Sequence, residues 1–522
     1  MKQTKKPTTK PTTKPTTTPT TKSAKKSKAK SIAKSGSDTA MKSSAESSSG
    51  TILIKSGAIH TASDSFRADL LVEHGKIVQI AAKIDTNFCH NAKVINAAGL
   101  DVFPGGIDVH THFELPFMGA VSPDDFSSGT VAAACGGTTT IVDFVIPSRG
   151  QRITEAAKMW HNKADGKCAV DYGFHIALVE FNDQVAKDIP KVIADGVTSF
   201  KCFLAYKNAL MVDDAQLLEI LYHARENGAL VSVHAENGDM LTFLMKHLLE
   251  SGNTAPRFHS EAHPAIAEAE ATHRAIVLAS MAAAPLYIVH MSCNEALEEV
   301  KIARSRGQMV LAETCPQYLL LDDELYNQPG FEGAKWVMSP PLRHFSNQDP
   351  LWEGLRDGFV QTVATDHCSF NYATQKKMGK EKFTLIPNGI PGVGDRMNLL
   401  YTYGVCRGRF SPNQFAAITA TNPARIFGMY PQKGTIAVGS DADLVFYDPK
   451  KKGKITDKNT LHNVDYSAYN NFELDGLPVL VLSRGVVVSK DQKFTGDTAH
   501  GRFLKRQPFT PSDWGFPEFE GF

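Results

Sequence analysis

The sequence predicts an α/β protein built on a (β/α)8 barrel of the TIM type, with a smaller β-sandwich domain formed from both chain ends. Eight apolar runs of strand length follow one another through the middle of the chain, and stretches with helical apolar spacing separate most of them. Strands that are apolar on both faces are typical of a parallel sheet covered by helices, which favours a barrel. Short strand-like runs near both ends predict the second domain.

The expected elements give a consistent division of the chain. The eight strand-like runs lie at residues 105–113, 138–146, 171–180, 198–206, 229–237, 285–292, 308–315 and 359–367. Helical spacing is clearest over 213–228 and 267–284. The predicted organisation is a tail over 1–50, the first part of the β-sandwich over 51–104, the barrel over 105–430, the second part of the sandwich over 431–490 and a C-terminal extension over 491–522.

The first fifty residues differ from the rest in charge and composition. They carry twelve lysines against Asp38 and Glu46, a charge of +10, so the rest of the chain carries −9 of the total of +1. Repeats of the type KPTTKPTT contain almost nothing apolar, which predicts a disordered segment because burial cannot offset its ordering entropy. The segment has no aromatic residue and no arginine, so nucleic-acid binding is not expected.

Several features favour a reducing, non-membrane setting. Hydrophobic residues make up 42% and charged residues 21% of the chain, which is typical of globular proteins. No apolar run approaches the roughly 18 residues of a membrane helix, and no secretory signal is present. The eight cysteines are scattered without C-x-x-C pairs, which indicates free thiols and a cytoplasmic location.

Four histidines and an aspartate lie at or near the C-terminal ends of the expected strands. His110 and His112 end the first, His234 the fifth, His290 the sixth and Asp366 the eighth. A single histidine on an apolar strand is more often a buried structural residue, but these strand ends converge on the catalytic face of a barrel. Imidazoles and carboxylates are the usual ligands of Zn²⁺ and similar ions. Five such groups exceed the needs of one catalytic ion, so the pattern predicts two ions.

Lys201 is the one charged residue in the fourth strand-like run. A structural ion pair would be the ordinary reading of such a lysine. Its position matches that of the ligands on the other strands, where an ammonium would be repelled by two dications. An amine that has captured CO₂ becomes a carbamate whose negative charge and two oxygens can span two metals. We therefore expect Lys201 to be carboxylated.

The residues around these positions carry a resemblance to a known family. The stretches PGGIDVHTHFELPFMG, GTTTIVDF, SFKCFLAYK, HAEN, VHMS, AETCPQYL, MSPPLR, VATDH, ATNPARIFG and DYSAYNNFELDG run from about Thr51 to Arg506. They resemble the hydantoinase/dihydropyrimidinase family of the amidohydrolase superfamily. The resemblance implies a barrel with a β-sandwich, two zinc ions per subunit, and CO₂ bound on Lys201 as N6-carboxylysine. It also implies a homotetramer, with contacts from the C-terminal extension.

The resemblance also assigns roles. The metal ligands would be His110, His112, Lys201, His234, His290 and Asp366. A hydroxide held between the two ions would attack the amide carbonyl of a cyclic ureide, and Asp366 would pass its proton to the departing nitrogen. Tyr206 would donate a hydrogen bond to the oxyanion, and Ser339 and Asn388 would hold the ureide edge. For Ser339 and Asn388, ordinary turn chemistry is the alternative.

The implied reaction is the zinc-dependent ring opening of 5,6-dihydrouracil and dihydrothymine to N-carbamoyl-β-amino acids in pyrimidine catabolism. The alternatives are a hydantoinase or allantoinase that acts on another cyclic ureide, and a noncatalytic scaffold of the same family. An intact set of six ligands favours an enzyme over a scaffold. Dihydroorotase is disfavoured, because its motif places Arg where Glu114 stands here. A small-molecule substrate is expected, with no nucleic acid and no membrane as partner.

Some neighbouring residues are expected to have other roles. Phe113, Leu115, Phe117 and Met118 are predicted to line the substrate pocket. His367 follows Asp366 and is expected to point away from it, in a supporting or structural role. Cys202 and Cys368 are expected to pack as small hydrophobic residues rather than bind metal.

Overall fold

A computed structural model describes residues 50–85, 89 and 91–516. Eight parallel strands form one sheet within this part of the chain, and neighbouring strands are hydrogen-bonded in the order β15-β14-β13-β12-β11-β10-β9-β6. Their bounds are β6 Gly106–Thr111, β9 Thr138–Val145, β10 Asp171–Ala177, β11 Ser199–Phe203, β12 Leu230–His234, β13 Leu286–Ile288, β14 Val310–Thr314 and β15 Thr362–Val363. All eight lie inside the runs predicted from the sequence, which confirms the barrel.

The barrel closes just after its last strand. His112 N donates to His367 O at 2.8 Å, and His367 N donates to His110 O at 3.3 Å. This short parallel bridge joins the segment after β15 to β6, so it unites the two ends of the sheet. Closure therefore takes place beside Asp366 and the two histidines of β6.

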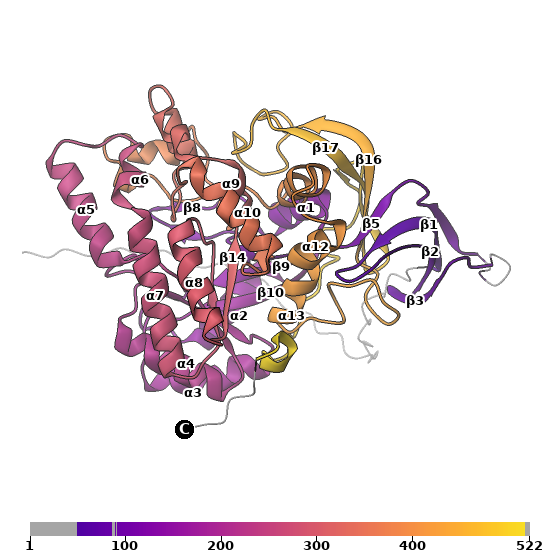
Figure 1. Ribbon diagram of the computed structural model, residues 1–522, viewed down its shortest axis with the longest axis horizontal. Coiled ribbons are helices and arrows are strands. Elements are labelled where there is room, and N and C mark those ends of the chain that lie inside the picture. The colour runs from indigo at the N-terminus through magenta and orange to yellow at the C-terminus, as the bar shows by residue number, and fades with distance from the viewer. Residues whose placement is uncertain (1–49, 86–88, 90, 517–522) are drawn as a thin grey trace, which may run out of the picture. The chain divides into compact units, whose positions relative to one another are not determined.

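Helices alternate with the barrel strands and flank them (Figure 1). Asp213 caps α4 by accepting a hydrogen bond from Gln216 N at 2.8 Å, which explains why the helix begins there. The bounds are α1 Phe126–Gly136, α2 Ile153–Ala164, α3 Asp183–Ala194, α4 Asp214–Glu226, α5 Gly238–Glu250, α6 Phe258–Ala262, α7 Ala265–Met281, α8 Asn294–Ser305, α9 Pro316–Leu320, α10 Gln348–Arg356, α11 Arg396–Leu400, α12 Pro412–Ala416 and α13 Asn422–Ile426.

The two ends of the described chain meet in a separate nine-stranded sheet, as predicted. Strand β5 pairs antiparallel with β16, so the N-terminal strands lie beside the C-terminal ones (Figure 1). The strands are β1 Ile52–His60, β2 Ser65–Glu73, β3 Lys76–Ala81, β4 Lys93–Asn96, β5 Asp101–Pro104, β16 Leu444–Lys454, β17 Glu473–Ser483, β18 Val486–Lys490 and β19 Lys493–Phe494. A short hairpin, β7 Pro116–Phe117 with β8 Ala120–Val121, follows β6. The domain boundaries drawn from the sequence stay a proposal.

A buried ion cluster ties this sheet to the barrel. Lys433 Nζ lies 2.6 Å from Asp171, 3.0 Å from Asp441 and 2.7 Å from Asp443. The guanidinium of Arg484 adds a contact of 3.1 Å to Asp171. The three carboxylates could hold a metal by their spacing, but the ammonium of Lys433 already supplies the positive charge between them.

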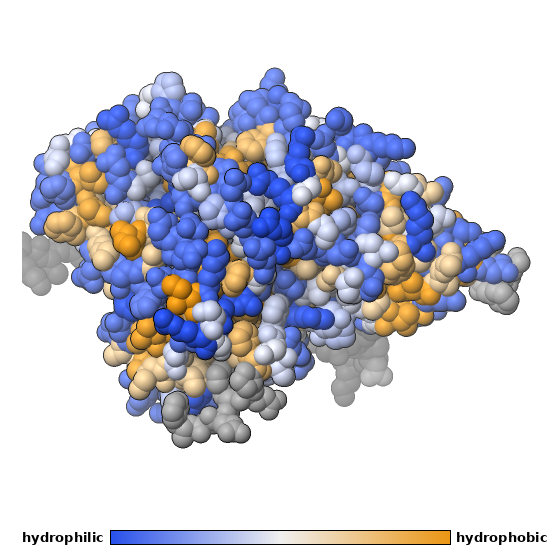
Figure 2. Space-filling view, viewed as in Figure 1, coloured by the Kyte–Doolittle hydropathy of each residue, from blue (hydrophilic) through white to orange (hydrophobic). Residues whose placement is uncertain are grey.

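Residues at the C-terminal end of the described chain pack on the barrel of the same chain. Leu504 and Phe509 belong to the apolar cluster that closes the N-terminal end of the barrel, and Leu504 N donates to Tyr172 O at 2.7 Å. Large apolar side chains are exposed on α5 and α7, where Figure 2 shows hydrophobic patches; Phe243 is 68% and Met281 72% exposed. The predicted homotetramer contacts stay a prediction.

The sequence predicts no membrane helix and a disordered N-terminal tail. Among the described helices, none has the length and apolar character needed to cross a bilayer. The disordered tail predicted over 1–50 lies outside the described residues, apart from Gly50.

Candidate functional site

The nine residues predicted for the site line one cavity at the C-terminal end of the barrel. They come from five barrel strands, or from the residues that follow these strands, and from two loops: His110, His112, Lys201, Tyr206, His234, His290, Ser339, Asp366 and Asn388. The structure therefore brings together residues separated by more than 270 positions.

One side of the cluster centres on Asp366. Its Oδ1 lies 3.1 Å from His110 Nε2 and 3.1 Å from His112 Nε2. Burial opposes ionisation of this carboxyl, but the charge and hydrogen bond of His110 and the hydrogen bond of His112 hold the pKa of Asp366 well below its ordinary value. Burial lowers the pKa of His112 to about 4, so this imidazole is neutral at pH 7 and able to bind a metal.

The other side pairs His234 with His290. Their Nδ1 and Nε2 atoms face each other at 2.9 Å, and both rings are buried. His234 Nε2 lies 2.9 Å from Glu236 Oε2, which leaves Nδ1 directed at the cavity. Burial holds the pKa of His290 well below its ordinary value, so this ring is neutral as well.

The side chains gathered in this cluster fit a bound metal ion. His110, His290 and Asp366 each offer a ligand atom, and these atoms lie within 4.8 Å of one another. Buried imidazole nitrogens are normally paired, but Nδ1 of His112 and Nδ1 of His290 have no hydrogen-bond partner. Four imidazoles and one carboxylate gathered in one place are the chemistry of a transition-metal site.

Lys201 reaches the same cluster from the middle of the barrel wall. It is 1% exposed, and its Nζ lies 5.0 Å and 5.3 Å from the ring centres of Phe144 and Phe203. Burial lowers the pKa of Lys201 to about 8. A lysine in these surroundings has an appreciable neutral fraction at physiological pH.

Three site residues adopt backbone conformations that side chains normally avoid. The φ angle is +51° at Asp366, +39° at His290 and +62° at Tyr206. Each such residue costs of the order of 1–3 kcal/mol and persists only where its surroundings hold it. The strain falls on the residues that face the cavity, which is typical of functional sites.

The substrate end of the cavity combines a polar corner with an apolar wall. Asn388 Nδ2 donates to Ser339 Oγ at 2.9 Å, and both side chains hydrogen-bond with the Tyr206 hydroxyl. The apolar wall is formed by Leu115, Phe117, Ile146, Phe203 and Leu210.

The prediction for the loop after His112 was half right. Leu115 and Phe117 line the cavity, but Phe113 and Met118 do not. Phe113 is fully buried instead, with its ring 5.7 Å from Phe126 and 5.4 Å from His367. Phe113 directly follows His112, and adjacent residues of an extended segment point to opposite sides, so its ring faces away from the cavity. Cys202 and Cys368 are buried as expected, and burial raises the pKa of the Cys202 thiol to about 12.

Two buried glutamates support the histidines and were not predicted. Glu313 Oε1 accepts from His110 Nδ1 at 2.7 Å and from His290 N at 3.1 Å. Glu236 lies between His234 and His263, with contacts of 2.9 Å to each. Their positions in the AETC and HAEN stretches, at the ends of strands, are the signal that could have found them. Such partners fix the orientation of a ligating imidazole.

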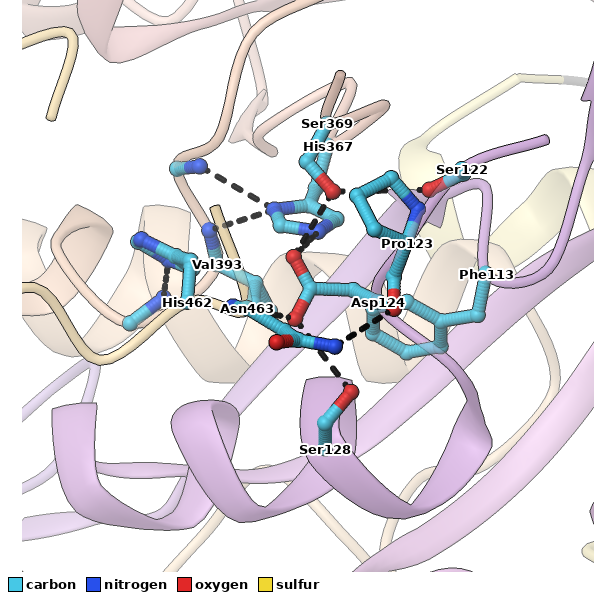
Figure 3. A network of polar contacts seen from close by, with 12 residues as sticks. Phe113, Ser122, Pro123, Asp124, Ser128, His367, Ser369, Val393, His462 and Asn463 are labelled. Carbon is cyan, nitrogen blue, oxygen red and sulfur yellow. Dashed lines mark hydrogen bonds and ion pairs between the residues drawn. The ribbon is translucent and has the colours of Figure 1, made fainter. Parts of the chain in front are cut away.

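His367 and Asp124 form a second buried pair behind Asp366 (Figure 3). Gly392 N donates to His367 Nδ1 at 3.1 Å, so the ring proton is on Nε2, which lies 3.2 Å from Asp124 Oδ2. Asp124 also accepts from Ser369 Oγ at 2.7 Å and from Asn463 N at 2.8 Å. His367 thus points away from Asp366, as predicted, and links the barrel seam to the loop of Gly392.

This network predicts a pH-dependent stability difference for Asp124→Asn. Burial opposes ionisation, but His367 and the backbone hold the pKa of Asp124 well below its ordinary value. A lowered native pKa stabilises the fold above the unfolded pKa of about 3.9, and this contribution is lost as the pH falls towards the native pKa. We expect the variant to lose about 1.5–3 kcal/mol at pH 7.

The measurement is urea unfolding of both proteins at several pH values. The difference should be constant from pH 7 to about 5 and shrink below about pH 4. Asp195→Asn, on the surface, is the control and should match the native protein throughout. A difference that grows on acidification would contradict the prediction.

Comparison with known proteins gives a consistent result. The sequence matches the amidohydrolase family over residues 102–488. It is 48% identical to a D-hydantoinase of Geobacillus stearothermophilus over 460 residues, which is 88% of this chain and 97% of that protein. It is 47% identical to a D-hydantoinase of Ralstonia pickettii over 459 residues, which is 88% of this chain and 99% of that protein. The crystal structure of a dihydropyrimidinase from Brevibacillus agri NCHU1002 superimposes with a TM-score of 0.87 at 48% identity, covering 88% of this chain and 99% of that one.

Proposed function

The chain belongs to the amidohydrolase family as a cyclic amide hydrolase of the hydantoinase and dihydropyrimidinase type, and from this premise we propose that it opens the rings of 5,6-dihydrouracil and dihydrothymine. The products would be N-carbamoyl-β-amino acids. The observation that carries the proposal is the convergence of six ligand-type side chains with Tyr206, Ser339 and Asn388 in one cavity.

The residues that would hold two zinc ions are His110, His112, His234, His290 and Asp366, joined by Lys201 in its carboxylated form. When bound, the ions would acidify a water molecule and polarise the amide carbonyl. Carboxylation forms a bond between Lys201 Nζ and the carbon of CO₂ and releases one proton. The aromatic surroundings of Nζ and the nearby imidazoles support this assignment.

Asp366 and Tyr206 carry the proton and charge movements. Asp366 Oδ1 contacts the two histidines of β6, and its second oxygen is the group that would accept a proton and pass it to the departing ring nitrogen. The Tyr206 hydroxyl, which lies in the same cavity, would donate a hydrogen bond to the oxygen on which charge develops. Burial raises the pKa of Tyr206 well above its ordinary value, so the hydroxyl keeps its proton at neutral pH.

The cavity favours a small uncharged ring. Ser339 and Asn388 offer hydrogen bonds to the edge of a ureide, and the wall around them is apolar. Apart from Lys201, no lysine or arginine of the described residues lines this cavity, so a substrate carboxylate would have no partner. Dihydroorotate is disfavoured on that ground.

A substrate panel tests the proposal. The protein, purified with zinc and bicarbonate, is assayed with dihydrouracil, dihydrothymine, hydantoin, allantoin and dihydroorotate, and its metal content is measured. We expect the highest kcat/KM with dihydrouracil and no turnover of dihydroorotate. A preference of about tenfold or more for hydantoin would replace dihydrouracil as the substrate, while absence of all turnover in metal-loaded protein would favour the scaffold alternative.

Hydantoin is the second candidate because the two curated relatives described above are D-hydantoinases. The two rings present the same ureide edge to Ser339 and Asn388 and differ by one ring atom on the other side, so only the measured kcat/KM values decide between them.

A further inference from the structure

Lys376 is a fully buried lysine outside the metal cluster. It begins a short 3₁₀ turn, Lys376–Gly379, and its side chain is 0% exposed. Its Nζ donates three hydrogen bonds of 2.7 Å, to the backbone oxygens of Val337, Pro387 and Gly389. Ammonium groups are rarely buried against neutral partners alone, because desolvation is costly.

The three oxygens belong to the two segments that build the polar corner. Val337 lies two residues before Ser339, and Pro387 and Gly389 flank Asn388 on either side. A backbone hydrogen bond also joins the two segments directly: Gly389 N donates to Val337 O at 3.0 Å. The ammonium therefore joins both walls of the corner from behind, while Asn388 Nδ2 and Ser339 Oγ join them at the front.

The residues that pack around Lys376 and the two segments restrict how far these segments can move. Gly389 has a φ of +143°, and a Cβ placed there would lie 2.2 Å from Cys368 O. On the other wall, His259 Nε2 lies 2.7 Å from Met338 O and fixes the residue before Ser339. Burial lowers the pKa of Lys376 to about 7, which measures how poorly the site is solvated. The three hydrogen bonds to carbonyl oxygens offset the cost of removing the ammonium from water.

We propose that Lys376 is the positioning residue that sets the spacing between Ser339 and Asn388, and with it the binding of the ureide edge. This inference rests on the proposed function, in which these two residues hold the ureide edge. Without the ammonium, the buried carbonyl oxygens of Pro387 and Gly389 lose their donor, Val337 O keeps only the bond from Gly389 N, and the walls separate. The metal cluster, which lies on the strand ends, stays in place.

Steady-state kinetics of Lys376→Met test the proposal, with the exposed Lys380→Met as matched control. We expect KM for dihydrouracil to rise about tenfold or more, with kcat within about threefold and an unchanged metal content, because ground-state and transition-state contacts weaken together. The KM for hydantoin should rise by a similar factor, because both rings present the same ureide edge. An unchanged KM in the folded variant would overturn the proposal.

Two further measurements keep the test decisive. Lys376→Gln, whose amide can donate to two of the oxygens, should give an intermediate KM, and it carries the test if the methionine variant does not fold. Hydrogen exchange at Gly389 N–H should accelerate in the variants and not in Lys380→Met, independently of activity. If the native protein turns over no ureide, the proposed function fails, and this exchange result alone still decides whether Lys376 holds the two segments together.

Discussion

We expect Asp366→Asn to lower kcat/KM for ring opening by about 10³-fold, because the amide cannot accept the proton that the carboxylate would accept. The substitution keeps the shape of the side chain and an oxygen that can face His110 and His112. The metal content should fall by less than the activity. The measurement combines kcat/KM with metal analysis of the same samples.

Asp349→Asn is the matched control for this variant, because Asp349 is an exposed residue of α10. It should retain native kinetics and metal content. An Asp366→Asn protein that keeps more than about a tenth of native kcat/KM would remove Asp366 from the proton transfer.

We expect Lys201→Ala to lower activity by at least about 10²-fold and to reduce the metal content per chain, because it removes the amine that would become the bridging carbamate. Native mass spectrometry should show the mass of one CO₂ on the native protein, lost from the variant. Acetate or propionate supplies a free carboxylate that fits the vacated space, and should restore part of the activity and the metal.

The surface variant Lys187→Ala is the control and should keep both the added mass and the activity. Native activity with two ions in Lys201→Ala would contradict the assignment of a carboxylated ligand. Loss of activity with full metal content and no rescue would leave Lys201 a different role, as a cation beside the substrate.

The site residues at the strand ends were predictable from the sequence, because the C-terminal ends of all barrel strands meet at one face of the barrel. His110 and His112 alternate with buried residues on β6, and His234 ends β12 as its run of apolar residues ends. Asp366 and His290 lie two to three residues beyond their strands, within the reach of the same rule. The pairing of the two chain ends in one sheet was predicted from the short strand-like runs near both ends of the sequence.

The residues that the sequence did not reveal act through contacts that carry no periodic signal. Lys376 contacts backbone oxygens, which any residue could provide. The sequence around Val337 and Pro387 therefore does not predict that these segments bind Lys376. Phe113 was assigned to the pocket from the resemblance of the stretch that follows His112, whereas its ring packs against Phe126 and His367. Asp124 and His367 meet across the barrel seam, 243 positions apart.

The joint between β5 and β16 makes the synthesis of this chain demanding. Val102 pairs with Phe446, which follows it by 344 positions. At about 5–20 residues per second, a ribosome needs about 17–70 s to deliver that partner. Through this interval the free edge of β5 offers unpaired backbone groups to any other strand in the cell. A nascent chain of this design therefore depends on protection by chaperones until its last hundred residues emerge.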